Sequence, residues 1–234
     1  MKNRIAIFGV ISLALLSWAL YQALVVAPTE ATMGDVQRIF YYHVPSAWTA
    51  FLLFMINCGA SAWYIAKRGA KADALALATA EVGLVFCTVV LVTGPIWARP
   101  VWGIWWTWDA RLTTTLILWL IYVAYLMLRK FSTSGQTPLI AAVLAVFGFL
   151  DVPLVYWSIR IFRTQHPQPV IAGGEGSGIA PAMMKALMIN WLAFLVFGSV
   201  IVWLRYVLER NKQNLNEAFA LKEESAHHHV GVAR

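Results

Sequence analysis

The chain alternates long apolar runs with short polar segments. Six of the runs approach or exceed the ~20 residues that a membrane-spanning helix needs. They cover residues 5–27, 47–66, 73–95, 113–128, 138–158 and 181–204. After the last run the sequence turns polar. The pattern predicts an all-α, polytopic membrane protein, with a six-helix membrane domain over residues 1–206 and a polar tail over residues 207–234.

The first apolar run follows Lys2 and Arg4, as the core of a secretory signal would. It is longer than the ~7–15 residues of such a core, so we expect a retained membrane anchor. The composition agrees with a membrane location, because 60% of the residues are hydrophobic and 12% are charged. A soluble domain has about 45–50% apolar and about 25% charged residues. Six spans in 234 residues leave little room for a separate soluble domain.

The 18 Lys and Arg residues are unevenly distributed over the connecting segments. If the N-terminus is cytoplasmic, the segments on that side carry twelve of these 18 residues and the opposite side carries six. The positive-inside rule then predicts that both termini are cytoplasmic. The net charge of +7 follows from this placement relative to the bilayer, so we expect no nucleic-acid partner.

With both termini cytoplasmic, six spans leave three loops on the outer side. These loops cover about residues 28–46, 96–112 and 159–180. The middle loop contains Trp97 and the run WGIWWTWD at 102–109, so five of the twelve tryptophans lie within twelve residues. The other two loops hold His43 and His166, the only histidines outside the polar tail. The distinctive residues are therefore all predicted on one side of the membrane.

The Trp-rich segment, residues 97–112, is predicted to lie at the interface between the third and fourth spans. An aromatic belt at the lipid headgroups is one interpretation. A platform for a flat apolar ligand is the other, since an indole offers an apolar face and one N–H donor. If the segment is helical, Trp102, Trp106 and Asp109 share one stripe, and Trp105, Trp108 and Leu112 share the next. Asp109 either caps the fourth span or belongs to the site itself.

His43 precedes the second span and His166 follows the fifth. Either could be a hydrogen-bonded structural residue, but two histidines on one side indicate a shared role as metal ligands. A zinc site needs three or four protein ligands and would have to recruit Glu30, Asp35, Asp109 or Glu175. Haem iron needs at most two axial ligands, which histidine commonly supplies. Two histidines beside a Trp platform therefore fit haem better than a bare ion.

Arginines near the outer face are candidate partners for the two haem propionates. They are Arg99, Arg111, Arg160 and Arg163. Each could instead extend its charged end to lipid headgroups.

Cys58 and Cys87 form no C-x-x-C-H motif, so we expect any haem to be held non-covalently. Both cysteines are best read as small buried residues.

Two carboxylates lie inside predicted spans. Glu81 and Asp151 could line a proton or ion pathway, although we favour helix–helix contacts or a subunit interface. Pro153 is expected to bend the fifth helix.

The Gly- and Pro-rich segment 167–181 is predicted to be irregular and could serve as a lid or docking segment. The tail histidines (His227, His228 and His229) suggest adventitious metal affinity at most.

Three motifs together resemble one known family. WGIWWTWDARLT at 102–113 resembles the WWD signature of the haem-handling membrane proteins of cytochrome c maturation. YYHVPSAW at 41–48 and RTQHP at 163–167 resemble the flanking histidine motifs of the CcmC family. The resemblance extends over about residues 1–205, and related WWD proteins are larger with more spans. The polar tail with its three histidines is not part of the family pattern.

This resemblance implies that haem b is held at the periplasmic face of the bacterial inner membrane, between His43 and His166 as axial iron ligands. It also implies a role for the Trp-rich segment 97–112, called the WWD segment from here on. Its candidate haem-contacting residues are Trp102, Trp105, Trp106, Trp108, Asp109 and Arg111. The implied partners are the haem chaperone CcmE, the ABC-type subunits CcmA and CcmB, the small membrane protein CcmD and the lipid bilayer.

The function expected from these features is presentation of haem, with no enzymatic step by a side-chain nucleophile. A role in attaching haem covalently to the chaperone stays open. Three other classes remain alternatives at this point: a transporter permease with Glu81 and Asp151 along its path, a membrane enzyme with a metal at His43 and His166, and a structural assembly subunit without a cofactor.

Overall fold

A computed structural model of the chain describes residues 2–162, 164–169, 171 and 178–232. Its elements are α1 (Lys2–Tyr21), the π-helical turn η1 (Gln22–Val26), the 3-10 turn η2 (Asp35–Ile39), α2 (Phe40–Lys67), α3 (Ala70–Trp102), α4 (Ala110–Phe131), α5 (Thr137–Phe149), α6 (Asp151–Ile161) and α7 (Pro181–Val232). The described residues form no β-strand. Within this described part of the chain, six segments are long and apolar enough to cross a membrane, which confirms the predicted fold class.

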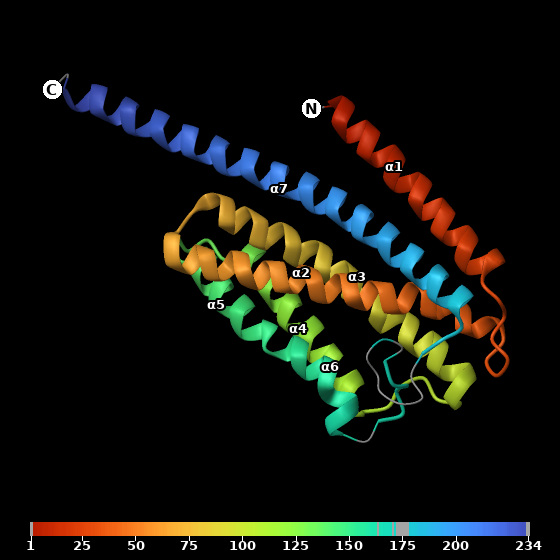
Figure 1. The fold of residues 1–234 in the computed structure, drawn as a ribbon. Helices are drawn as coiled ribbons and strands as arrows, with labels where there is room; N and C mark the ends of the chain where they lie inside the picture. Colours follow the sequence, from red (N-terminus) through yellow and green to blue (C-terminus); the bar gives the residue numbers. More distant parts are fainter. Residues whose placement is uncertain (1, 163, 170, 172–177, 233–234) are drawn as a thin grey trace.

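The helices α2 and α3 form an antiparallel hairpin at the centre of the molecule (Figure 1). On one side, α4 packs against α3, α5 and α6; on the other, α7 packs against the hairpin and α1 packs against α7. Figure 1 shows the connections α1–α2, α3–α4 and α6–α7 at one end of the bundle, which we call the site end. The N-terminus and the α2–α3 and α4–α5 connections lie at the other end. The fold thus groups the three predicted outer loops.

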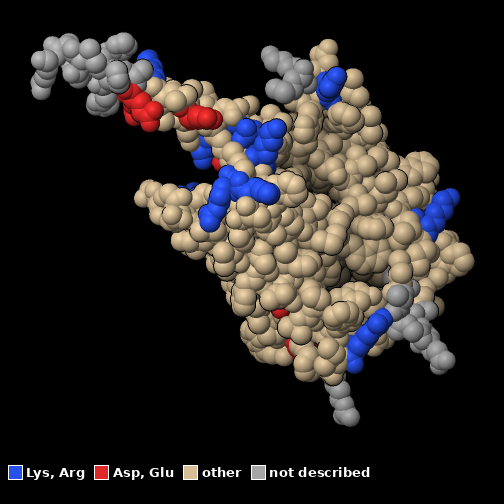
Figure 2. All heavy atoms as spheres, turned by 60° about the vertical axis from the view of Figure 1, so that its left-hand side comes forward, with Lys and Arg blue, Asp and Glu red and all other residues tan. Residues whose placement is uncertain are grey.

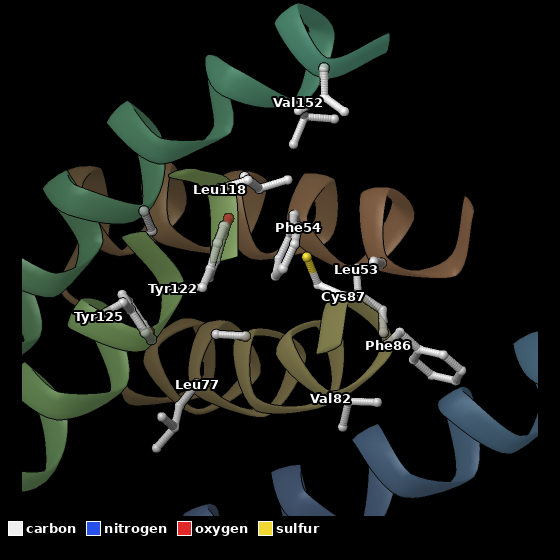
Figure 3. Close-up of a cluster of buried hydrophobic side chains, with 14 of the residues drawn as sticks. Leu53, Phe54, Leu77, Val82, Phe86, Cys87, Leu118, Tyr122, Tyr125 and Val152 are labelled. Atoms are coloured by element: carbon white, nitrogen blue, oxygen red, sulfur yellow. The ribbon is translucent and has the colours of Figure 1, made fainter. Parts of the chain in front are cut away.

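The main core lies between α2, α3, α4 and the α5–α6 pair (Figure 3). The rings of Phe54 and Tyr122 stack with centroids 3.7 Å apart. The Tyr122 hydroxyl donates to Asn57 Oδ1 at 3.2 Å, and Asn57 Nδ2 donates to the Ala76 carbonyl at 2.7 Å. Since buried polar groups need such partners, these bonds fix α2, α3 and α4 together. A Cβ at Gly83 would lie 2.7 Å from the Phe54 ring, so the hairpin helices meet where only glycine fits.

Two helices extend further toward the site end than their apolar runs predicted. The turn η2 begins at Asp35 and continues directly into α2, so His43 lies in a helix and not in a loop. The helix α3 continues past residue 95, so Trp97 and Trp102 belong to its last turns. An apolar run marks only the part of a helix that suits the bilayer interior. Aromatic and polar residues can continue the helix through the interface.

Residues 103–109 of the Trp-rich segment are not helical. Gly103 has a φ of 78°, in the left-handed region that favours glycine, and its N–H bonds to the Arg99 carbonyl. It therefore ends α3, and residues 104–109 lead to α4 without regular structure. The two helical Trp stripes considered for this segment are not formed.

The predicted fifth span is divided into α5 and α6 at Leu150. Pro153 has no N–H to offer the Phe149 carbonyl, so the helical ladder is interrupted there. At the same junction, the Leu150 N–H bonds to the Phe147 carbonyl, three residues back, at 3.1 Å. After this interruption, α6 leads into the segment that carries His166.

Charged groups inside the bundle are mostly paired. Arg205 of α7 donates to both carboxylate oxygens of Glu81 in α3, at 2.6 and 2.7 Å. This is the helix-contact role expected for Glu81. Arg129 of α4 and Gln213 of α7 both donate to Asp73 of α3. Asp151 differs, because its Oδ2 is buried and has no hydrogen-bond partner among the described residues.

The predicted polar tail is the continuation of α7, a single helix of 52 residues. A helix of that length spans about 78 Å, well beyond the ~30 Å hydrocarbon core of a bilayer. Figure 2 shows acidic residues along its projecting part and Lys and Arg gathered at the base. Most of the remaining surface visible in Figure 2 is uncharged, as expected for a protein surrounded by lipid.

Candidate functional site

A cavity of about 520 Å³ opens at the site end, between α2, α3, α4, α6 and α7. This volume lies within the ~300–1,000 Å³ range of small-molecule sites. The walls are mostly aliphatic and aromatic side chains. Of the residues singled out from the sequence, the cavity is lined by His43, Trp97, Trp102, Trp106, Arg111 and His166. The fold therefore brings together residues from all three predicted outer loops.

The two histidines face one another across this cavity. The ring centroids of His43 and His166 are 6.4 Å apart, with 33° between the ring planes. Two imidazoles that bind one ion from opposite sides, each through a nitrogen about 2.0 Å from the ion, have ring centroids roughly 6.3 Å apart. The observed spacing therefore suits one metal ion ligated by both rings.

Both rings make their hydrogen bonds through Nδ1. His43 Nδ1 lies 2.9 Å from Thr93 Oγ1, and His166 Nδ1 lies 2.9 Å from the Pro167 carbonyl. A carbonyl only accepts, so His166 carries its proton on Nδ1, and its Nε2 lone pair is left for a ligand. Bonding of the second ring nitrogen to a carbonyl is a common feature of metal-binding histidines.

His166 lies outside the spanning helices and is neutral. Burial in the apolar cavity, reinforced by the nearby charge of Arg111, lowers the pKa of His166 to about 3. Burial disfavours the imidazolium because its charge loses solvation. A neutral imidazole is the form that ligates a metal, so this ring is ready for ligation at physiological pH.

Asp109 is predicted as a site residue but does not line the cavity. Its Oδ1 accepts from the Leu112 N–H at 3.0 Å and caps α4, one of the two roles considered for it. Its Oδ2 accepts from the Thr164 hydroxyl at 2.7 Å, and Thr164 Oγ1 accepts from the His166 N–H at 3.1 Å. Asp109 thus acts on the site through Thr164, by holding the segment that carries His166.

The tryptophans of the WWD segment divide into two groups. Trp102 and Trp106 line the cavity. Trp105 and Trp108 do not belong to its lining, and 58% and 75% of their surfaces are exposed. The division follows from the irregular backbone after Gly103, which turns alternate indoles outward. The sequence motif alone does not distinguish the two groups.

Arg111 is the one Asp, Glu, Lys or Arg side chain among the described residues that line the cavity. Its Nη1 donates a long hydrogen bond of 3.5 Å to the Val155 carbonyl. A guanidinium has five N–H donors in a planar fork that matches a carboxylate. Arg111 therefore gives the apolar cavity one position suited to an anionic group.

Two further tryptophans line the cavity that the sequence interpretation missed. Trp48 of α2 and Trp191 of α7 contact edge to face, with ring centroids 5.2 Å apart. Both lie in apolar runs and look like ordinary span residues, although Trp48 ends the YYHVPSAW motif. The indole N–H groups of Trp106 and Trp191 are buried without a partner among the described residues.

The remaining arginine candidates lie elsewhere. Arg99 donates to the Gly103 carbonyl, and the Arg160 guanidinium lies 5.9 Å from the centre of the Tyr156 ring. Arg163 lies outside the described residues, as does Glu175 of the zinc alternative.

No three His, Cys, Asp or Glu side chains come together as a metal site within the described part of the chain. Cys58 and Cys87 are free thiols. Cys87 is buried as predicted and contributes to the cavity wall, whereas Cys58 is only partly buried. The tail histidines lie on α7, and the structure does not describe their side chains.

The family model for "CcmC: Heme exporter protein C" matches residues 1–220. The chain belongs to the CcmC family. The heme exporter protein C of Bradyrhizobium diazoefficiens is 33% identical to this chain, over 77% of this chain and 68% of its own length. The heme exporter protein C of Haemophilus influenzae is 30% identical over 89% of this chain and 85% of its own length. A putative cytochrome c biosynthesis ccmC-like mitochondrial protein of Marchantia polymorpha is 29% identical over 90% of this chain and 88% of the relative. These matches confirm the resemblance drawn from the motifs, and the residues matched by the family model include all six apolar runs.

Proposed function

We propose that this chain binds haem b non-covalently at the periplasmic face of the bacterial inner membrane and presents it to the chaperone CcmE. Membership of the CcmC family supports a part in haem delivery for cytochrome c biogenesis. The observation that carries the proposal is the 6.4 Å spacing of the His43 and His166 rings across one apolar cavity.

The two imidazoles ligate the haem iron from opposite faces of the porphyrin. His166 is neutral, and its Nδ1 is bonded to the Pro167 carbonyl, which leaves Nε2 for the iron. Two axial imidazoles fill both open iron positions and leave no position for oxygen. The cargo is thereby carried in an unreactive form.

The aromatic walls contact the porphyrin faces and edges. Trp102 and Trp106 supply indole surface from the WWD segment, and Trp48 and Trp191 supply it from α2 and α7. Arg111 pairs with one propionate, because a charge in an apolar cavity needs a counter-ion. Trp105 and Trp108 are exposed outside the cavity lining and meet lipid headgroups or a partner protein.

In this account the chain is a carrier and not an enzyme. Release to the chaperone requires one iron–imidazole bond to open, and the ABC-type subunits CcmA and CcmB, together with CcmD, are the proposed partners that drive this step. The permease alternative draws no support from Glu81, whose carboxylate is paired with Arg205.

Loading of the chaperone tests the proposal. Membranes containing this chain, CcmA, CcmB, CcmD and CcmE are supplied with haem, and covalently bound haem on CcmE is measured by in-gel haem staining. His43→Ala and His166→Ala should each abolish loading, whereas His227→Ala in the tail should leave it unchanged. Normal loading by both cavity variants, at wild-type levels of inserted protein, would overturn the proposal.

A further inference from the structure

Thr93 of α3 contacts the ring of His43 on the side away from its Nε2. Its Oγ1 lies 2.9 Å from His43 Nδ1. The same oxygen lies 2.6 Å from the Val89 carbonyl and 3.4 Å from the Val90 carbonyl, within its own helix. Thr93 thus has two close neighbours, and its hydroxyl has a single proton to share between them.

The positions of the protons follow from these contacts. A backbone carbonyl can only accept, and 2.6 Å is a normal O–H···O distance, so the Thr93 hydroxyl donates to Val89. Without that proton, two oxygens would face each other at 2.6 Å. Thr93 Oγ1 is then an acceptor toward His43, and the bond at 2.9 Å needs a proton on His43 Nδ1. A neutral imidazole protonated on Nδ1 carries its lone pair on Nε2.

We propose that Thr93 is a positioning residue that selects the Nδ1-protonated tautomer of His43 and thereby presents its Nε2 as the ligand. That the metal on this ligand is haem iron rests on the proposed function; the tautomer itself does not. The Val89 carbonyl sets the direction of the Thr93 hydroxyl, so helix α3 fixes the proton of a histidine on helix α2.

The arrangement has a consequence for the iron. A hydrogen bond from Nδ1–H to an acceptor makes the imidazole more basic, and loss of such a partner typically lowers metal affinity about 10–100-fold. A more basic axial ligand favours ferric iron, so removing the Thr93 acceptor raises the reduction potential of bound haem. His166 has a backbone acceptor, the Pro167 carbonyl, which substitution cannot remove. Thr93 is therefore the place where this effect can be tested.

The chain offers a matched control on the same helix. Thr88 Oγ1 donates to the Leu84 carbonyl at 2.8 Å and accepts from the Trp119 indole N–H at 2.8 Å. It thus makes the same pair of bonds as Thr93, including one from a ring nitrogen, but it does not contact a histidine. Thr88→Val and Thr93→Val each remove one such pair, and only Thr93→Val alters the His43 ligand.

The first experiment needs no haem. The full chain, with ¹⁵N-labelled histidine, is examined by NMR in detergent micelles, and the His43 signals are assigned by their loss in His43→Gln. We expect Nδ1 of His43 to be protonated and Nε2 to be unprotonated in the wild type and in Thr88→Val. Thr93→Val should shift His43 toward the other tautomer, and Thr93→Ser should restore the wild-type pattern. Protonation of Nε2 in the wild type would overturn the proposal even if no Thr93 variant folds.

The second experiment uses haemin, the ferric form, added to the purified full chain. Thr93→Val should weaken haemin binding about 10–100-fold and raise the midpoint potential measured by spectroelectrochemistry. Thr93→Ser and Thr88→Val should match the wild type in both. An unchanged potential and affinity in Thr93→Val, in a protein that needs both histidines for binding, would overturn the role of Thr93 alone. Haemin binding that needs neither histidine would instead overturn the proposed function.

Discussion

Thr164 donates a hydrogen bond of 2.7 Å to the carboxylate of Asp109, the residue that caps α4. The bond joins the segment that carries His166 to the end of the WWD segment, 55 positions away in the sequence. One carboxylate thus stabilises a helix with one oxygen and orders a ligand-bearing segment with the other. The Asp of the WWD motif is therefore a positioning residue and not a wall of the cavity.

This relationship predicts different effects for two substitutions. Asp109→Ala removes both the cap and the bond to Thr164, so it should lower stability by about 1 kcal/mol and also weaken haemin binding. Thr164→Val removes the tie to His166 but keeps the cap, so it should weaken binding with a smaller loss of stability. Thermal unfolding and haemin titration of the two variants measure the effects separately. Wild-type haemin affinity in both variants would contradict the positioning role.

The division of the tryptophans predicts unequal roles within one motif. Trp106→Ala should lower haemin affinity about tenfold, since an aromatic contact contributes roughly 0.5–1.5 kcal/mol beyond its buried area. Trp108→Ala removes an indole that is 75% exposed and should change affinity by less than about twofold. Fluorescence quenching titrations with haemin compare the two. Equal losses would show that the outward-facing indoles contact the porphyrin as well.

Arg111 is predicted to recognise a propionate. Arg111→Gln should weaken binding of haemin by about tenfold or more, because a hydrogen bond to a charged group contributes roughly 1.5–3 kcal/mol. Haemin dimethyl ester lacks the negative charges, so the wild type should bind it more weakly than haemin, whereas Arg111→Gln should bind both about equally. A preference for haemin that survives in Arg111→Gln would assign the propionate to another residue.

The orientation of the bundle is a further prediction. In a chain whose two natural cysteines are replaced, Ile104→Cys in the WWD segment should react with a membrane-impermeant maleimide added to intact spheroplasts. Ser134→Cys, in the α4–α5 connection, should react only after the membrane is permeabilised. The reverse pattern would place the cavity on the cytoplasmic side and exclude direct delivery to a periplasmic chaperone.

The spacing of apolar and polar residues was sufficient to predict the six spans, because the length of a spanning helix is set by the bilayer. It also placed His43, the WWD segment and His166 at one end, since alternating spans allow only two ends. Helix limits were less predictable: α2 and α3 continue through interfacial residues, so His43 and Trp102 lie in helices. Trp48 and Trp191 were missed because the sequence does not say which span residues face a cavity. Thr93 and His43 lie 50 positions apart in the sequence. Only the packing of α2 on α3 reveals their contact.

The central claim is that His43 and His166 jointly ligate haem iron. The most direct measurement is the absorption and electron paramagnetic resonance spectrum of the purified chain with one equivalent of haemin. We predict a low-spin, six-coordinate spectrum for the wild type. His43→Gly and His166→Gly should each lose it, and added imidazole should restore it in both. A six-coordinate low-spin spectrum that persists in either glycine variant without imidazole would contradict the claim.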